Sequence, residues 1–421
     1  MKTEKFTSAQ LNEQYTLTTL DNGLKVYVFE KENFNTAYAL FGTQYGSIDT
    51  EFSLNGGETV KVPEGIAHFL EHKLFESEDG DAFTKYAKTG AYANAYTSFD
   101  RTCYLFNCSN MFEENLDILL DFVQNPYFTQ QTVDKEQGII GQEIRMYDDS
   151  PVWCVFFNLL DALYFNHPVK IDIAGTVESI AKIDAPLLYK CYNTFYNPAN
   201  MFICIAGNVD GEKVIQKING SIKKHDKADI KRVTPPEPQD VRLRYIEKKL
   251  DVAMPLFNYG YKLPADKAPT QRDSICTDVL LNCLFGDITP FYEEMTEKCL
   301  INDEFDTEFF FGRGYSAVIL SGESADPKKV CEAAKKRIAD VMRDGVDEKI
   351  FEAVRRDLYG GAVKRYNSVE DIAASLTDSA ISGYNVFDEI EILKSINKTD
   401  VEKYLKIFDE NKSALSVILP R

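Results

Sequence analysis

The sequence lacks the features that mark several common classes of protein. Only four histidines and one tryptophan occur in 421 residues, and none of the nine cysteines stands in a CxxC pair. No apolar run approaches the roughly 18 residues that a membrane-spanning helix needs. Neither a GxxxxGK[ST] phosphate loop nor a GxSxG nucleophile elbow is present. These absences argue against a transmembrane protein, a P-loop nucleotide enzyme and a serine hydrolase.

Positive charge is also in short supply. The chain has 47 Lys and Arg against 66 Asp and Glu, a formal net charge of −19. Nucleic acids and anionic membrane surfaces both require basic patches, so neither is an expected partner. The amino-terminal MKTEKFTSAQLNEQYTL has no apolar signal core, and an odd number of scattered cysteines fits buried thiols. We therefore expect a cytoplasmic protein.

The length and the pattern of hydrophobic residues predict two domains. A chain of this length exceeds one ordinary core and suits two domains of about 200 residues. The charged segment 223–240 carries Pro235, Pro236 and Pro238 and has no helical or strand period, so it is predicted to be an exposed linker. It separates residues 1–222 from residues 241–421, and the element order strands, helices, strands, helices occurs on both sides of it. This order predicts an α+β fold with two homologous domains, each a mainly antiparallel sheet with helices packed on one face.

Two of the four histidines occur together in GIAHFLEHKLFE, within residues 63–86, a region predicted to be helical. His68 and His72 are four residues apart, so in a helix both rings can reach one point, and Glu71 lies beside that point. HxxEH is the HExxH zinc motif read backwards, and it supplies the same two neutral imidazoles and a flanking general base. The alternative is a pair of core histidines beside a surface glutamate.

A catalytic zinc needs a third protein ligand and an open position for water. The predicted helix VDKEQGIIGQEI offers Glu136 and Glu143, seven residues apart and therefore on one face. Ile139 and Ile140 on the same side are apolar, so this face is predicted to be buried. Because a buried carboxylate is costly unless it meets a metal or a cation, at least one of the two is a candidate ligand. A surface ion pair remains an equal alternative for Glu136.

With HFLEH and Glu143, the chain resembles the inverzincin metallopeptidases of the pitrilysin and insulinase group, which include the mitochondrial processing peptidase. The resemblance implies that Glu143 is the third ligand, that Glu136 supports a ligand, and that Glu71 accepts the proton of the attacking water. It also implies that Asn94 and Ala95, in GAYANAYTSFDRTCY, hold the peptide backbone along an edge strand. Within the group, the chain is most similar to small bacterial insulinase-type proteins associated with elongation factor P 5-aminopentanol modification.

The second half lacks the metal-binding set. Alignment of NCLF with HKLF, and of the two long helices, places Asp278, Leu281, Asn282 and Arg356 opposite His68, Glu71, His72 and Glu143. We therefore expect one zinc ion per chain and a structural, substrate-holding second domain. Arg313 and Tyr315 in FGRGYSAVIL are candidates for the family's substrate-gripping pair, although a strand-end arginine and a sheet tyrosine explain them more simply.

Two functions from different classes follow from these observations. The first is a zinc-dependent endopeptidase that hydrolyses peptides or unfolded protein segments. The second is an interaction or assembly subunit of a two-chain peptidase or peptide-maturation complex, with little activity alone. The intact ligand set favours the first, because a scaffold has no use for a buried polar cluster. Since related enzymes enclose peptides between four such domains, the resemblance also implies a homologous two-domain partner chain or a homodimer.

Overall fold

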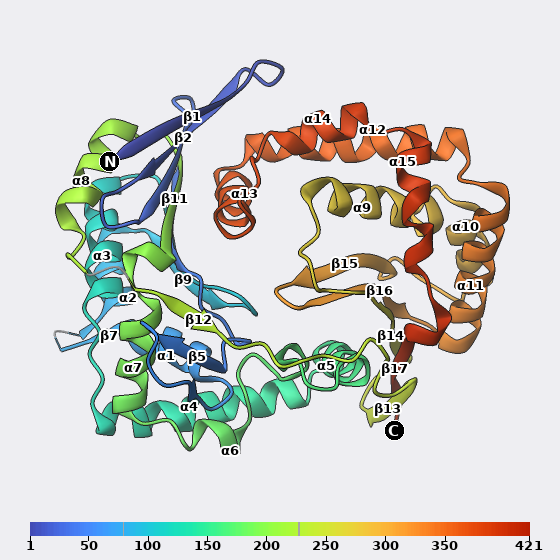
Figure 1. The fold of residues 1–421 in the computed structure, drawn as a ribbon, viewed down its shortest axis with the longest axis horizontal. Coiled ribbons are helices and arrows are strands. Elements are labelled where there is room, and N and C mark those ends of the chain that lie inside the picture. The colour runs from blue at the N-terminus through green and yellow to red at the C-terminus, as the bar shows by residue number, and fades with distance from the viewer. Residues whose placement is uncertain (79, 226–227) are drawn as a thin grey trace. The chain divides into compact units, whose positions relative to one another are not determined.

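The computed structural model describes residues 1–78, 80–225 and 228–421 (Figure 1). Residues 226 and 227 of the predicted linker lie outside the described residues. The chain forms two compact units, and neither unit is a continuous half of the sequence. Unit 1 contains residues 1–144, 172–233 and 363–387, and unit 2 contains residues 145–171, 234–362 and 388–421.

Unit 1 is built on a seven-stranded sheet with the order β1-β2-β3-β11-β4-β10-β9. Its strands are β1 (Lys2–Ser8), β2 (Glu13–Thr19), β3 (Lys25–Glu30), β4 (Ala37–Thr43), β9 (Tyr92–Thr97), β10 (Thr102–Cys108) and β11 (Met201–Gly207). Two small sheets contain β5 (Glu51–Leu54), β6 (Val60–Lys61) and β12 (Ile230–Arg232), and β7 (Glu76–Ser77) with β8 (Gly80–Asp81). The helices are α1 (Ile66–Leu74), α2 (Ala82–Thr89), α3 (Phe112–Gln124), α6 (Val177–Ile180), α7 (Ala185–Phe195), α8 (Gly211–Ser221) and α13 (Val369–Ser382).

Unit 2 is built on a five-stranded sheet with the order β13-β17-β14-β16-β15. Its strands are β13 (Tyr245–Leu250), β14 (Leu256–Lys262), β15 (Asp306–Gly312), β16 (Tyr315–Glu323) and β17 (Ser413–Pro420). Its helices are α5 (Pro151–Leu163), α9 (Gln271–Phe285), α10 (Pro290–Glu297), α11 (Pro327–Asp344), α14 (Asp388–Ser395) and α15 (Lys398–Glu402). Two long helices, α4 (Gln130–Asp148) and α12 (Glu348–Lys364), each carry the chain from one unit into the other.

The two large sheets share one topology. In unit 1, β3 pairs with β11 in parallel, and β11-β4-β10-β9 continue as antiparallel neighbours. In unit 2, β13 pairs with β17 in parallel, and β17-β14-β16-β15 continue in the same antiparallel manner. Because β11 and β17 each enter the interior of a sheet from a distant position in the chain, this agreement extends beyond strands that are neighbours in sequence. The predicted α+β fold with two homologous domains is confirmed.

The central strands of unit 1 are buried on both faces, and their residues alternate between two cores. Along β11, Ile203 and Ile205 enter a core shared with helices α1, α3 and α7, whereas Phe202 and Cys204 enter a second core on the opposite face. Side chains in a strand point to alternate faces, so one apolar stretch can serve both cores. The second core also contains Leu376 of α13, which packs on β11 and β4.

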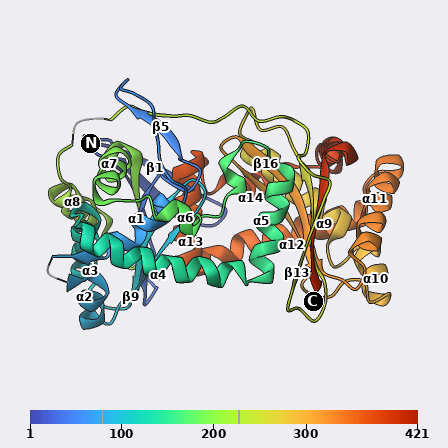
Figure 2. The ribbon, with the colours of Figure 1, turned by 90° about the horizontal axis from the view of Figure 1, so that it is seen from below.

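Each unit therefore receives one helix from the other half of the sequence. Residues 363–387, which include α13, belong to unit 1, and residues 145–171, which include α5, belong to unit 2. Helix α5 packs on β14 and β17 of unit 2 (Figure 2). A side chain at Gly260 of β14 would meet Leu159 and Leu163 of α5 at 3.0–3.1 Å, so the absence of a side chain there permits this close approach. Helix α5 follows α4 and α13 follows α12, so each half of the sequence contributes one helix to the other half's unit. We refer to this as the reciprocal exchange.

One local expectation was wrong, and a second was incomplete. The helix predicted across residues 63–86 is interrupted by the β7–β8 hairpin, and α2 begins only after Asp81, whose side chain accepts a hydrogen bond from the Phe83 amide. The linker predicted at 223–240 contains β12, which pairs with β5. A strand of three residues is too short to show a period in the sequence, and pairing with a distant strand stabilises it.

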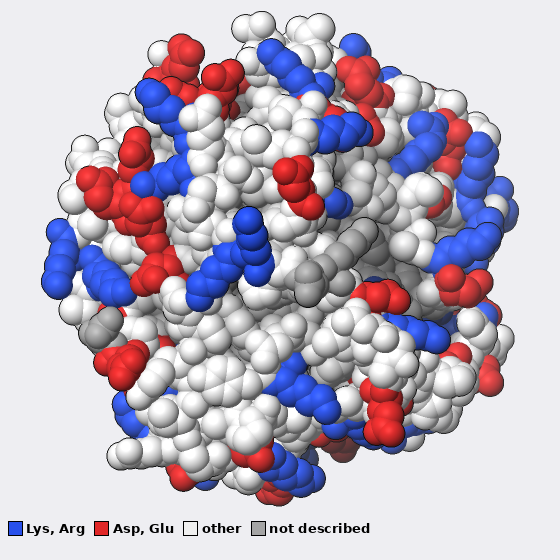
Figure 3. Space-filling view, turned by 60° about the vertical axis from the view of Figure 1, so that its left-hand side comes forward, with Lys and Arg blue, Asp and Glu red and all other residues white. Residues whose placement is uncertain are grey.

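The surface shows mixed charge. On the face in Figure 3, Lys and Arg side chains are interspersed with Asp and Glu, consistent with the net charge of −19. Among the described residues, no helix is both long enough and apolar enough to cross a bilayer.

Candidate metal centre

Helix α1, which carries the HxxEH motif, is buried along almost its whole length, including His68 and Glu71. It begins after Gly65, whose φ of 84° lies in the left-handed region. A side chain at Gly65 would lie only 2.2 Å from the backbone oxygen of Ala174, so only glycine fits at this start. Because most of α1 is buried, most of its residues are apolar and its polar residues stand out.

Three side chains converge at one point in unit 1. His68 Nε2 lies 3.7 Å from Glu143 Oε1, and His72 Nε2 lies 3.5 Å from Glu143 Oε2. The two imidazole rings are 4.6 Å apart between their centroids, and one ligand atom from each of the three residues falls within 4.8 Å of the others. No other group of this kind occurs among the described residues. Each histidine Nε2 thus faces one oxygen of Glu143, at a distance longer than that of a charge-assisted hydrogen bond.

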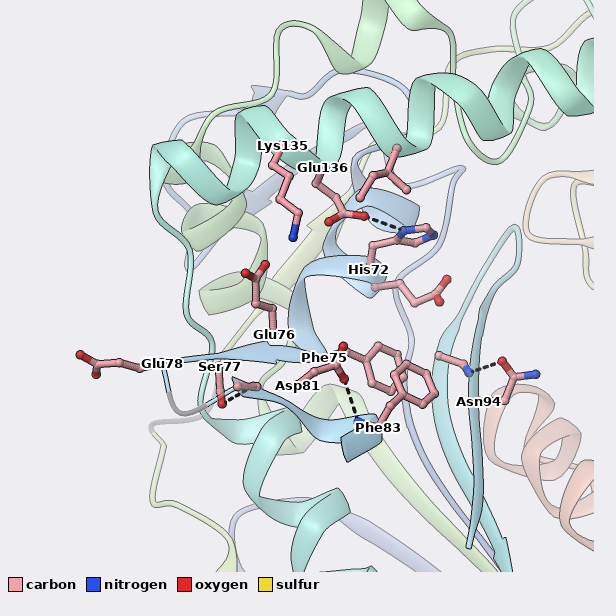
Figure 4. A pocket seen from close by; sticks show the side chains of 14 residues that line it. His72, Phe75, Glu76, Ser77, Glu78, Asp81, Phe83, Asn94, Lys135 and Glu136 are labelled. Carbon is pink, nitrogen blue, oxygen red and sulfur yellow. Dashed lines mark hydrogen bonds and ion pairs between the residues drawn. The ribbon is translucent and has the colours of Figure 1, made fainter. Parts of the chain in front are cut away.

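Glu136 holds His72 from the opposite side of its ring. His72 Nδ1 lies 3.0 Å from Glu136 Oε1 (Figure 4). The other ring nitrogen, Nε2, lies 3.5 Å from Glu143 Oε2. Glu136 and Glu143 come from one face of α4, as their spacing predicts. That face was predicted to be buried on account of Ile139 and Ile140; Ile140 is buried, but Ile139 is 46 % exposed and borders a cavity.

The protonation of the two histidines differs. Burial, with a smaller contribution from His72, lowers the pKa of His68 to about 3, so that its ring is neutral at physiological pH. Burial also opposes a charge on His72, but the hydrogen bond to Glu136 and the charge of Glu71 outweigh it, and its pKa is raised. Burial alone would raise the pKa of Glu136, whereas the bond to His72 lowers it. Glu136 therefore remains an ionised acceptor.

Glu71 lies beside the three converging residues, and its carboxylate is buried. Burial raises its pKa and the charge of Glu143 adds to this, against opposing effects of His72 and of a hydrogen bond from Thr97. Thr97 Oγ1 donates to Glu71 Oε2 at 2.9 Å. The sequence reasoning did not identify Thr97; the signal available was its place two residues after Ala95, on the same face of the strand.

A cavity of about 570 Å³ opens between α1, β9 and α4, with Glu71 and His72 on its wall (Figure 4). Asn94 and Ala95 line it from β9, which is the last strand of the unit 1 sheet and pairs only with β10 in the described part of the chain. Asn94 is exposed, and its Oδ1 accepts a hydrogen bond from the Ala95 amide. The structure thus places both predicted peptide-binding residues on an edge strand next to the histidines.

Arg313 and Tyr315 belong to unit 2, whereas the residues above belong to unit 1. Arg313 lies in the turn between β15 and β16, and its backbone oxygen is 3.0 Å from His167 Nε2. Tyr315 is buried and packs against Phe310 and His167. His167 also accepts the Val169 amide through Nδ1, so its two ring nitrogens order this part of unit 2.

The converging residues fit zinc. Ligands at 2.0–2.2 Å around a tetrahedral zinc lie roughly 3.4 Å apart, close to the observed separations of the histidine nitrogens from the Glu143 oxygens. Two imidazoles and one carboxylate are also the donor types of catalytic zinc sites. A metal-binding histidine usually donates its other ring nitrogen to a carboxylate, which is the arrangement of His72 and Glu136.

Comparison with sequence families gives two consecutive matches. Residues 58–177 match the family described as Insulinase (Peptidase family M16), and residues 182–358 match the Peptidase M16 inactive domain. The first match contains all the residues of the candidate centre. The second match covers most of unit 2, including Asp278 and Asn282, which the sequence alignment predicts to lie opposite the two histidines.

Individual proteins resemble the chain over its full length. It is 42 % identical over 407 residues, 94 % of each chain, to the uncharacterized zinc protease YmfH of Bacillus subtilis. A crystal structure of a putative M16-like peptidase from Alicyclobacillus acidocaldarius superposes with a TM-score of 0.94 and 31 % identity, covering 99 % of this chain and all of that one. The periplasmic protease PqqL from Escherichia coli, at 16 % identity and a TM-score of 0.75, matches 97 % of this chain with only 48 % of its own.

Proposed function

Since the chain belongs to the insulinase family of peptidases, family M16, we propose that it is a zinc-dependent endopeptidase that hydrolyses peptides or unfolded protein segments. The observation that carries the proposal is the convergence of His68, His72 and Glu143 beside a buried Glu71. Its setting, a cavity next to an edge strand, suits an extended peptide chain.

In this proposal His68, His72 and Glu143 hold the metal, and Glu136 orients His72. When bound, zinc supplies a Lewis acid that polarises the peptide carbonyl and makes a water molecule acidic at neutral pH. Glu71 accepts the proton of the attacking water and passes it to the leaving amine. Burial suits this role, because a raised pKa brings the carboxylate nearer to the working pH.

Substrate is proposed to bind as an added strand along β9, with Asn94 and Ala95 contacting its backbone. Arg313 and Tyr315 are kept as candidates for a substrate grip in the second domain, although the burial of Tyr315 favours a structural role. Within the sequence, residues 1–222 are proposed as the catalytic domain, 223–240 as the linker and 241–421 as a repeat that binds no metal.

The surroundings of the enzyme are proposed on separate grounds. All nine cysteines are unpaired, and eight are buried, which suits a reducing cytoplasm. A chain such as PqqL is about twice as long as this one, so we propose that a second two-domain chain, a homologue or another copy, completes the substrate chamber. The resemblance to proteins associated with elongation factor P modification adds no chemistry, and the proposal does not depend on it.

The test is the metal content of the purified chain, measured together with peptide hydrolysis before chelation, after chelation, and after zinc is restored. We expect about one zinc per chain and hydrolysis that chelation abolishes and zinc restores. Absence of zinc would refute the proposal. Stoichiometric zinc without hydrolysis, in the presence of a homologous partner chain as well as alone, would favour the assembly-subunit function.

A further inference from the structure

The carboxylate of Glu71 has a single hydrogen-bond donor in the described part of the chain, the hydroxyl of Thr97. The base is on α1, and its donor is on β9, the strand proposed to receive substrate. A glutamate side chain has three rotatable torsions, so a general base on a helix needs an outside contact to hold one orientation. Thr97 provides that contact at 2.9 Å.

The hydrogen atom of the Thr97 hydroxyl can be assigned from its neighbours. Thr102 is fully buried and pairs directly opposite Thr97 on β10, with their two hydroxyl oxygens 3.5 Å apart. The Thr102 hydroxyl donates to the backbone oxygen of Tyr45 at 2.8 Å. A hydroxyl has one proton, so Thr102 has none left for Thr97. Thr97 therefore donates to Glu71, the nearer and charged acceptor.

This bond divides the roles of the two Glu71 oxygens. Oε2 accepts from Thr97, whereas Oε1 accepts no hydrogen bond in the described part of the chain, so we assign the proton of the attacking water to Oε1. Threonine is β-branched and stiff at χ1, and alternation places Thr97 on the inner face of β9 with Ala93 and Ala95, which pack against the core. The packing of β9 against the core therefore fixes the direction of the Thr97 hydroxyl.

We propose that Thr97 is a positioning residue for the reaction, which orients the Glu71 carboxylate so that Oε1 faces the attacking water. The inference rests on the proposed function, because it assumes that Glu71 is the general base. It adds a link between substrate binding and catalysis. The strand β9 contacts the substrate backbone through Asn94 and Ala95, and Thr97, two residues after Ala95 on the same strand, orients the general base Glu71. Thr97 contacts neither the metal ligands nor the substrate in this scheme.

Three variants of the full-length chain test the inference. Thr97→Val keeps the branched shape and removes the hydroxyl, whereas Thr97→Ser keeps the hydroxyl. Thr3→Val is the matched control, because it removes one threonine–threonine hydrogen bond, to Thr18 at 2.9 Å, on the opposite edge of the same sheet. For each variant, kcat and KM are measured with a fluorogenic peptide that the wild-type chain cleaves, and the zinc content of the same protein preparation is determined.

We expect Thr97→Val to lower kcat by about 10- to 100-fold, with KM within about twofold of wild type and zinc content unchanged. Thr97→Ser should recover most of kcat, and Thr3→Val should match wild type. An unchanged kcat in Thr97→Val, equal losses in the valine and serine variants, or a rise in KM alone would each overturn the inference. Absence of zinc and hydrolysis in the wild-type chain would instead refute the proposed function.

A second measurement needs no activity. The urea midpoint of the metal-free chain is compared for wild type, Thr97→Val, Glu71→Leu and the double variant. If Thr97 donates to Glu71, Thr97→Val should lower the midpoint in wild type and have a clearly smaller effect in the Glu71→Leu background, where the acceptor is gone. Equal effects in both backgrounds would show that the hydroxyl does not act on Glu71 and would overturn the inference.

Discussion

At the scale of single residues, Glu143 presents one oxygen to each histidine, whereas Glu136 contacts only His72. The two carboxylates on one face of α4 thus have different contacts, and measurements of metal binding can distinguish the proposed ligand, Glu143, from Glu136, which orients His72. Substitution Glu143→Gln should lower zinc affinity by at least about 10²-fold while the fold is retained, measured by metal analysis after dialysis and by circular dichroism. The same change at exposed Glu114 of α3 is the control. Wild-type zinc content in Glu143→Gln would refute the ligand assignment.

Glu71 is distinguished from the ligands by the same approach. Because its carboxylate accepts from Thr97 and lies beside the converging atoms, Glu71→Gln should retain zinc. Hydrolysis should fall by at least about 10²–10⁴-fold, the usual contribution of a general acid–base group. Metal analysis and steady-state kinetics on one preparation provide both results. Loss of zinc together with activity would make Glu71 a ligand.

Asp278, which the sequence alignment predicts to lie opposite His68, has an unusually high pKa. Burial, with the nearby charges of Glu389 and Glu308, raises its pKa to about 7. In the unfolded chain it ionises near pH 4, so the contribution of Asp278 to the stability of the wild-type chain should fall as the pH rises from about 4 to about 7 and then level off. Three pKa units correspond to an upper bound of roughly 4 kcal/mol.

Substitution Asp278→Asn removes this loss. Its unfolding free energy should therefore exceed that of wild type above about pH 7 and differ little near pH 4, in urea titrations across this range. The same substitution at exposed Asp303 is the control. A gain for Asp278→Asn that is equal at pH 4 and pH 8 would exclude the buried carboxyl as its cause.

At the scale of elements, the reciprocal exchange makes the second half of the sequence part of the first unit's core. Leu376 of α13 is fully buried among residues of β4 and β11. Leu376→Ala should cost about 2–5 kcal/mol, the usual effect of such a cavity. Hydrogen exchange should quicken in β4 and β11, although both strands lie far away in the sequence.

Leu243 provides the comparison, because it is 39 % exposed. Leu243→Ala should cost less than about 1 kcal/mol and leave exchange in β4 and β11 unchanged. If amide hydrogen exchange in β4 and β11 is equally slow in Leu376→Ala and wild type, the role of α13 in the core of unit 1 is contradicted.

At the scale of the whole molecule, the linker is attached at both ends. Arg232 pairs with buried Asp49, and the Val233 amide donates to Glu51, all within unit 1. On the other side, Glu237 accepts three backbone amides from residues 165–167 and pairs with buried Lys262, all within unit 2. Residues 234–236 of the predicted linker lie between these two sets of contacts.

The second chain proposed above predicts association. If a second two-domain chain closes the site, the rate of hydrolysis per chain should rise with chain concentration or on addition of a homologous chain, in parallel with the mass measured by light scattering. The control is wild-type chain mixed with the Glu71→Gln chain. This variant can associate but should add no hydrolysis of its own, so any increase in rate comes from assembly. A chain that stays monomeric and reaches its full rate at every concentration would contradict the paired chamber.

The sequence by itself determined the coarse order of strands, helices, strands and helices in each half, the two-domain α+β class and the candidate ligands. Local periodicity reports which residues share a face, so His68, Glu71 and His72 on one helix and Glu136 and Glu143 on another could be recognised without coordinates. The tertiary structure decided what depends on contacts between distant segments. It placed Glu143 against the two histidines and Thr97 against Glu71, exposed Ile139, paired β12 with β5, and gave α5 and α13 to opposite units. Such contacts join residues tens to hundreds of positions apart, and no local pattern records them.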